Sequence, residues 1–246
     1  MERLKKTLYL TIHRGTKEIG GSCVELATKN TRILIDIGLP LVDEGGQSFN
    51  LGNYLKLTNA ELFEKNIAKD IPGLYKEDNG SKPPNAILIS HSHPDHYGLL
   101  TFVKSQIPLY MSEGCLELIK ATYYFKGINT DFNNVEIVED KKYFVVGDFK
   151  ITPYLVDHSG FDSYAFLVEA EGKRIFYSGD FRGHGKKSRL FDKFIAHPPK
   201  NIDYLIMEGT GIDGKDGYSE KEEELRDRLV TIFKEKSGLV FFACSS

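Results

Sequence analysis

Three histidines and an aspartate lie within the six residues 91–96 of this chain. They follow the apolar run 86–89, which is typical of a buried strand. Residues two apart project from the same side of an extended segment, so the first two imidazoles point the same way. Pro94 suits the first turn of a helix, and the two residues after it can turn toward the same point. The candidate ligands for a pair of divalent metal ions are His91, His93, Asp95 and His96.

Two later segments carry further candidate ligands. His158 ends the segment Leu155-Val-Asp-His158, and Asp180 ends the segment Phe176-Tyr-Ser-Gly-Asp180. Each residue by itself could equally be a polar group that caps a strand. The candidate ligands at 91–96 do not by themselves complete the coordination of two metal ions. Metal binding by His158 and Asp180 is therefore the favoured interpretation. Gly179 would let the backbone turn beneath the second ligand.

Composition limits the classes of function. The 246 residues suffice for one large domain or two small ones. The net charge is −3, which argues against a protein that holds nucleic acid by a broad basic surface. A local basic groove that uses Lys186, Lys187 and Arg189 stays open.

The cysteines and apolar segments indicate the cellular setting. Cys23, Cys115 and Cys244 are scattered and form no CxxC pair, so we expect neither a disulfide framework nor a cysteine zinc site. No segment approaches the roughly 20 apolar residues that span a bilayer. We therefore expect a cytoplasmic protein that does not contact a membrane.

Strand and helix patterns alternate along the chain and predict an α/β fold. Two sheets packed face to face with helices outside would bury the apolar runs, and loops at one edge would carry the chemistry. Strands are expected at residues 8–13, 23–27, 32–37, 86–90, 108–111, 143–146, 149–156, 164–169, 174–177, 204–207 and 239–243. Helices are expected at 60–69, from Pro94 to 104, from 113 to 125, and from the capping pair Ser219 and Glu222 to Gly238.

The pattern His-x-His-x-Asp-His at 91–96 resembles the signature of the metallo-β-lactamase fold superfamily, and the resemblance covers nearly all of residues 1–246. It implies a four-layer αββα sandwich of two mixed sheets flanked by helices. It also implies that His91, His93 and His158 hold one metal ion. Asp95 and His96 would then hold the second ion, and Asp180 would bridge the two.

Other segments resemble the β-CASP branch of this superfamily, which includes ribonuclease J. They are the run 158–163, the acidic residue Glu208 at the expected end of a strand, and the final run 237–246. The resemblance implies that Glu208 acts in catalysis and that residues from about 209 lead into a cap domain absent from this chain. The alternative for Glu208 is that it only caps a turn or accepts backbone hydrogen bonds.

The chain departs from the family in one respect. The family supplies a further histidine to the second metal ion from far downstream, whereas this sequence stops at Ser246. His184 and His197 are the only later histidines; neither is expected to be a ligand, although His184 could substitute. His13 is expected to be structural or to lie near the rim of the site, and not to be a ligand. We therefore expect a fragment of a longer polypeptide, with a second metal ion that binds more weakly or takes water as a ligand.

The resemblance implies a dinuclear metal-dependent hydrolase that cleaves phosphodiester bonds, above all in RNA. A metal-bound hydroxide would be the nucleophile, and Asp95 would orient it or carry its proton. Zinc is the expected metal, with manganese or iron as alternatives. Two other functions stay open, namely a hydrolase of thioesters, lactones or cyclic nucleotides, and a metal-binding scaffold without turnover. Formation of a homo-oligomer is also left open.

Overall fold

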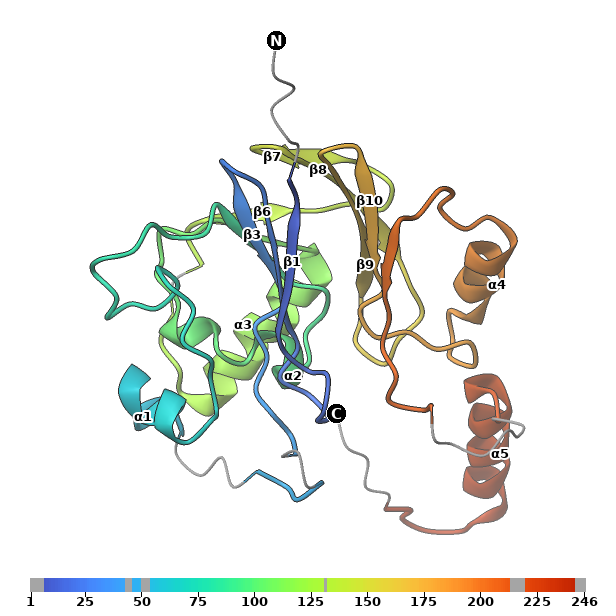
Figure 1. Ribbon diagram of the computed structural model, residues 1–246. Coiled ribbons are helices and arrows are strands. Elements are labelled where there is room, and N and C mark those ends of the chain that lie inside the picture. The colour runs from blue at the N-terminus through green and yellow to red at the C-terminus, as the bar shows by residue number, and fades with distance from the viewer. Residues whose placement is uncertain (1–6, 43–45, 50–53, 131, 213–219, 242–246) are drawn as a thin grey trace.

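The computed structural model describes residues 7–42, 46–49, 54–130, 132–212 and 220–241. Two mixed β-sheets face each other in the middle of the molecule, and helices cover the outer side of each sheet (Figure 1). This is the predicted four-layer αββα arrangement. Successive residues of a strand point to opposite faces. Each sheet therefore directs alternate side chains toward the other sheet and toward its own helices.

The first sheet has the strand order β1-β2-β3-β4-β5-β6. Its first three strands are antiparallel, and the pairs from β3 to β6 are parallel. Parallel strands end at the same edge of a sheet, so the histidine-rich loop after β4 leaves from the edge at which β3 also ends. The strands are β1 (Tyr9–Arg14), β2 (Cys23–Ala27), β3 (Arg32–Ile35), β4 (Ala86–Leu88), β5 (Leu109–Met111) and β6 (Val135–Ile137).

The second sheet has the order β11-β10-β9-β8-β7. Both β8 and β10 are antiparallel to β9, so they run in the same direction and end at one edge. β11 is parallel to β10 and ends there too. The strands are β7 (Phe144–Val146), β8 (Phe149–Leu155), β9 (Tyr164–Ala170), β10 (Lys173–Tyr177) and β11 (Tyr204–Ile206).

Helices flank both sheets (Figure 1). On the side of the first sheet lie α1 (Asn59–Glu64), α2 (Pro94–Tyr97) and α3 (Glu113–Lys126), and on the side of the second lie α4 (Ser188–Ala196) and α5 (Glu222–Glu235). Ser112 caps α3 by accepting the backbone N–H of Cys115 at 3.1 Å. Gly127 ends this helix with a φ of 65°, a backbone conformation that glycine adopts at little cost.

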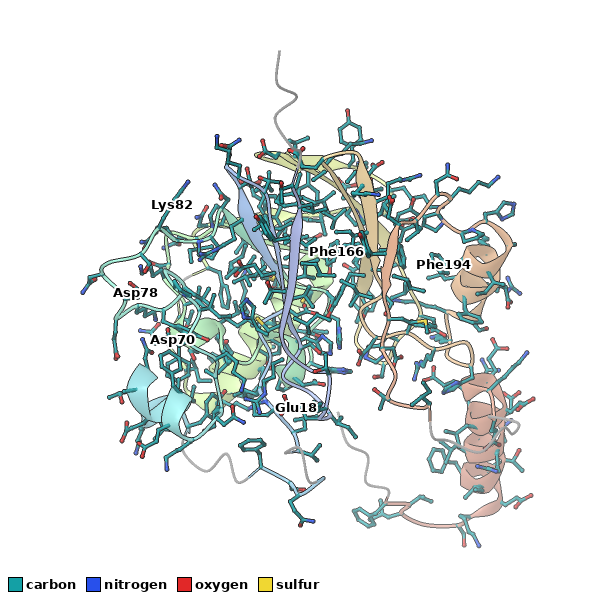
Figure 2. All side chains as sticks on the ribbon, viewed as in Figure 1. Glu18, Asp70, Asp78, Lys82, Phe166 and Phe194 are labelled. Atoms are coloured by element: carbon teal, nitrogen blue, oxygen red, sulfur yellow. The ribbon has the colours of Figure 1, made fainter. Side chains whose placement is uncertain are left out.

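The apolar core follows the alternation of the strands. On β9, Phe166 and Val168 pack between the two sheets, whereas Ala165 and Leu167 face the opposite side, toward α4. Phe166 is fully buried, and Phe194 of α4 packs against the apolar cluster that contains Ala165 and Leu167 (Figure 2). A larger cluster fills the space between the first sheet and its helices.

Several predicted elements differ in the structure. The helix from Pro94 stops at Tyr97 and a separate 3-10 turn covers Leu100–Phe102, so the prediction of one helix to 104 is wrong. The helix predicted at 60–69 ends at Glu64, just before Asn66 takes a positive φ of 52°. Residues 239–241 are not in a strand, and 242–246, like Ser219, lie outside the described residues. Strand β6 and helix α4 were not predicted from the sequence. None of the helices in the described ranges is long and apolar enough to cross a membrane.

Candidate metal centre

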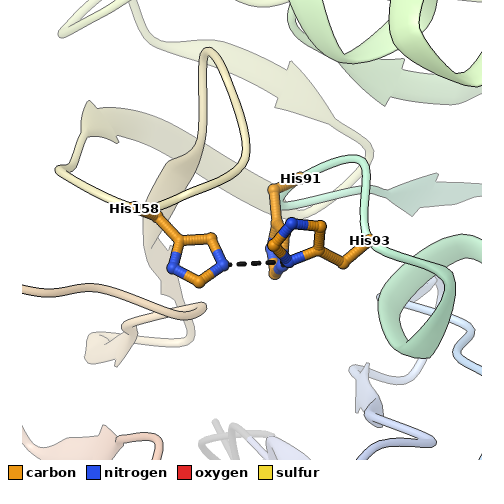
Figure 3. A group of neighbouring side chains, drawn as sticks. All are labelled: His91, His93 and His158. Atoms are coloured by element: carbon orange, nitrogen blue, oxygen red, sulfur yellow. Dashed lines mark hydrogen bonds between the residues drawn. The ribbon is translucent and has the colours of Figure 1, made fainter. Parts of the chain in front are cut away.

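Three imidazole rings meet between the two sheets, and we call His91, His93 and His158 the histidine trio (Figure 3). Nδ1 of His93 lies 3.1 Å from Nε2 of His91 and 3.0 Å from Nε2 of His158. Ligand nitrogens 2.0–2.1 Å from a tetrahedral zinc ion are about 3.3 Å apart. The spacing of this trio therefore fits one zinc-sized ion.

The ends of two strands bring this trio together. The loop after β4 carries His91 and His93, and the loop after β8 carries His158. The backbone N–H of Tyr164 donates to Ser90 O at 2.9 Å, which joins the second sheet to the start of the first loop. A side chain at Gly160 would crowd the ring of His91, since its Cβ would lie 3.3 Å from Cδ2.

A second group of donors shares His91 with the first, and we call His91, His96 and Asp180 the mixed trio. Oδ1 of Asp180 lies 3.4 Å from Nε2 of His96, and Oδ2 lies 3.9 Å from Nε2 of His91. Asp180 also lies 3.8 Å from Nε2 of His158, so its carboxylate faces both trios. Asp95 belongs to neither trio, but its Oδ2 is 3.6 Å from Nε2 of His96. The structure thus brings all six predicted ligands to one place.

A buried carboxylate that was not predicted from the sequence lies behind these ligands. Asp36 follows β3 with a φ of 59°, and it is 0% exposed. Its oxygens accept the backbone N–H of Ser90 at 2.7 Å, the Ser90 hydroxyl at 2.7 Å and the Tyr177 hydroxyl at 2.6 Å. Nδ1 of His96 is 2.7 Å from the same carboxylate. An aspartate inside the apolar run 33–37 was the sequence signal for this residue.

The hydrogen bonds assign the tautomers of two histidines. Nδ1 of His96 faces an anion, so it carries a proton and Nε2 is left for a metal ion. Ser90 has a single hydroxyl proton, which it donates to Asp36. Nδ1 of His91, 3.0 Å from the Ser90 hydroxyl, must then be the donor. Nε2 of His91 therefore has a free lone pair that points into the centre.

The pKa values of the histidine trio favour neutral rings. Burial, together with the nearby His96, lowers the pKa of His91 well below its usual value. Burial lowers the pKa of His158 to about 4, and it also lowers the pKa of His93. Neutral imidazole is the form that binds metal, so this trio is ready for an ion at pH 7.

His96 and Asp95 behave differently. Burial opposes a charge on His96, but the carboxylates of Asp36 and Asp180 outweigh it and raise the pKa of His96 to about 10. In the metal-free protein this ring is therefore an imidazolium. Burial, with a contribution from Asp180, raises the pKa of Asp95 above its usual range.

Glu208 lies in the same open groove as Asp95, His96 and Asp180. The volume of this groove is about 700 Å³. The carboxylate of Glu208 accepts the backbone N–H of Phe181 at 3.3 Å and that of Thr210 at 3.2 Å. These bonds are the backbone contacts that the sequence analysis named as the alternative role for this residue.

The remaining histidines lie elsewhere. Nε2 of His13 is 3.1 Å from the carboxylate of Glu25 on the neighbouring strand β2. Neither His184 nor His197 joins a donor group among the described residues. The structure thus offers no substitute histidine for the second ion within the described ranges.

Comparisons with known proteins agree with this geometry. The family described as "Beta-lactamase superfamily domain" matches residues 63–220. A ribonuclease J of Helicobacter pylori strain 26695 is 27% identical over 98% of this chain and 33% of its own length. An RNase J-like protein of Methanocaldococcus jannaschii is 25% identical over 89% of this chain and 47% of its own length. The chain thus spans between a third and a half of the length of these curated relatives.

A solved structure supports the fold. The crystal structure of a protein of unknown function from Enterococcus faecalis V583 matches with a TM-score of 0.76 and 23% identity. The match covers 94% of this chain and 58% of that protein. At this identity the likeness concerns the fold alone.

Proposed function

Because this chain belongs to the beta-lactamase superfamily, we propose that it is a metal-dependent hydrolase that cleaves phosphodiester bonds in RNA. The observation that carries the proposal is the pair of donor groups that share His91 at the edge where both sheets end. The ribonuclease J relatives support RNA as the substrate. Cytoplasmic location stays a prediction, and formation of a homo-oligomer stays open.

We assign the ligands by their positions. The histidine trio would hold one ion, His96 and Asp95 would hold the second, and Asp180 would lie between them. Nitrogen and oxygen donors in this number suit zinc, and they also suit manganese or iron. When bound, such ions supply Lewis-acid activation of water and of the phosphodiester group.

The protein's own residues orient these ligands and move the proton. Asp36 fixes the ring of His96 and, through Ser90, that of His91. A carboxylate within hydrogen-bond reach of the attacking water can take its proton, and Asp95 lies in the groove wall beside His96. Its raised pKa makes this carboxylate a stronger base than an exposed aspartate.

We propose that Glu208 supports the reaction by positioning. Its carboxylate holds the backbone N–H of Phe181, the residue that follows Asp180. Its own N–H donates to the hydroxyl of Ser178, on the other side of the same loop. Glu208→Gln should therefore reduce turnover more than it reduces metal content.

One experiment tests the proposed function against its alternatives. The metal content of the purified protein is measured, and single-stranded RNA, single-stranded DNA and chromogenic esters and lactones are offered as substrates. We expect RNA cleavage that EDTA abolishes. His93→Ala should lose both metal and cleavage with the fold intact, whereas the exposed His197→Ala serves as the matched control. Turnover of esters or lactones alone, or full RNA cleavage by His93→Ala, would reject the proposal.

A further inference from the structure

An exposed aromatic ring lies beside the candidate metal centre. Phe161 is three residues after His158, and 61% of its surface is exposed. The preceding residue, Gly160, packs against the rings of His91 and His158, since a Cβ there would lie 3.3 Å and 3.6 Å from their Cδ2 atoms. Phe161 is therefore attached directly to the backbone that borders the histidine trio.

The loop that carries Phe161 is held firmly. The Ser163 hydroxyl donates to Gly160 O at 2.8 Å, and the Ser112 hydroxyl donates to Asp162 O at 2.7 Å. The ring lies against the first turn of α3, where a Cβ on Gly114 would be 2.6 Å from Cδ1 of Phe161. A phenyl group fixed in this way loses little conformational entropy when a ligand stacks on it.

A lysine from the loop after β10 covers the ring. Nζ of Lys187 lies 4.7 Å from the ring centroid of Phe161. This lysine belongs to a short basic run with Lys186 and Arg189. No carboxylate in the described part of the chain lies within ion-pair distance of these three side chains. The two loops that supply His158 and Asp180 thus also supply an aromatic ring and a cation.

We propose that Phe161 and Lys187 form a binding site for one nucleotide of a single-stranded nucleic acid that lies across the metal centre. The base stacks on Phe161, and the ammonium group of Lys187 moves to the adjoining phosphate. This inference rests on the proposed function, because it names a contact for the same polyanionic substrate.

The energies favour this exchange. An exposed cation–π contact strengthens binding about 2- to 5-fold. Stacking of a base on an aromatic side chain strengthens binding about 5- to 140-fold and depends little on the base. A base can therefore displace the lysine from the ring. The lysine loses little, since it gains a phosphate partner.

Binding to metal-stripped protein tests this inference without turnover. The probe is a short single-stranded RNA that contains 2-aminopurine, whose fluorescence falls when the base stacks. We expect the wild-type protein to quench the probe, and Phe161→Tyr to preserve this effect. Phe161→Ala should lose the quenching and bind about 5- to 140-fold more weakly, since about 1.4 kcal/mol corresponds to a factor of ten.

Two further variants sharpen the test. Lys187→Ala should lower the salt dependence of binding by about 0.7 in the log–log slope, which is the contribution of one phosphate on a single strand. Phe125→Ala removes another exposed phenyl, at the far end of α3, and should bind as the wild type does.

Two results distinguish an error in the nucleotide site from an error in the proposed function. If Phe161→Ala binds and quenches like the wild type while the metal-loaded wild type cleaves RNA, the nucleotide site is wrong and the proposed function stands. If the wild type neither binds the probe nor cleaves RNA, both are overturned. Equal losses in Phe125→Ala and Phe161→Ala would also reject the site.

Discussion

At the scale of single residues, one buried carboxylate organises the centre. Asp36 gathers hydrogen bonds from Ser90, Tyr177 and His96, and these residues come from three different segments. A carboxylate that orients a ligand histidine also raises the basicity of that ligand. The hydrogen bonds of Asp36 and Ser90 therefore orient the rings of His96 and His91 before a metal ion binds.

Asp36→Asn tests this role. The amide carries no charge and its nitrogen cannot accept a hydrogen bond, so His96 loses its anionic partner. We expect the affinity for zinc to fall about 10- to 100-fold, which is typical for the partner of a ligand histidine. The affinity is measured by competition with a chelator. Asp192→Asn, on the exposed surface of α4, is the matched control. An unchanged zinc affinity in a folded Asp36→Asn protein would contradict the assignment.

The pKa of His96 leads to a second prediction. This ring is protonated below about pH 10 in the metal-free protein, so an ion can bind Nε2 only after it displaces a proton. The pKa values of the histidine trio lie below the usual value, so these rings are mainly neutral at pH 7 and contribute little to proton release. We therefore expect about one proton to be released at pH 7 when the second site fills, and metal affinity to rise with pH. Calorimetry in buffers of different ionisation enthalpy measures the number. Release of no proton would show that His96 is not a ligand.

At the scale of elements, strand ends and the short helix α2 position the site. The segment 37–39 runs beside the ligand loop, where Ile37 N–H donates to His96 O at 2.7 Å and Leu39 N–H donates to Pro94 O at 3.0 Å. Between them, a Cβ on Gly38 would lie 1.5 Å from Asp95 O. The absence of a side chain at Gly38 thus lets the two segments touch.

Gly38→Ala should therefore damage both stability and metal binding. The added methyl group forces the backbone at Asp95 and His96 to move, and such crowding costs about 1–3 kcal/mol or more. We expect a lower melting temperature and weaker zinc binding. Gly80→Ala is the control, because nothing lies within 4 Å of the Cβ that it adds. Equal melting temperatures for the two variants would contradict this account.

The same elements show what a sequence can predict. Ligand spacing at 91–96 and the strand ends at His158 and Asp180 are local patterns, and the structure brings these residues together as expected. Asp36 was missed because its partner Tyr177 lies 141 positions later in the chain. The α4 helix was missed although its apolar residues at 190, 191, 194 and 195 follow a helical spacing. The predicted helix to 104 was wrong because the next helical hydrogen bond is replaced: Leu99 N–H donates to Ile37 O at 3.1 Å, and Asp95 O accepts the N–H of Ser22 at 3.1 Å.

At the scale of the whole molecule, the centre joins two sheets. The loop after β4 of the first sheet carries His91 and His93, and the short helix α2 that follows carries Asp95 and His96. The loops after β8 and β10 of the second sheet carry His158 and Asp180. Phe166 and its neighbours fill the space between the sheets. A metal ion bound by ligands from both sheets would therefore hold the two sheets together, as the apolar core between them does.

This arrangement predicts that metal ions stabilise the fold through ligands from both sheets. A ligand that binds only the folded state at 100 times its dissociation constant adds about 2.7 kcal/mol to the free energy of unfolding. Phe166→Ala should lower that free energy by about 3–5 kcal/mol, and zinc should restore part of the loss, since its ligands remain. His93→Ala should gain much less from zinc than the wild type. Urea unfolding with and without zinc measures each value, and the exposed Phe125→Ala shows the effect of losing a phenyl group outside the core. An equal gain from zinc in His93→Ala and the wild type would show that the ion binds elsewhere.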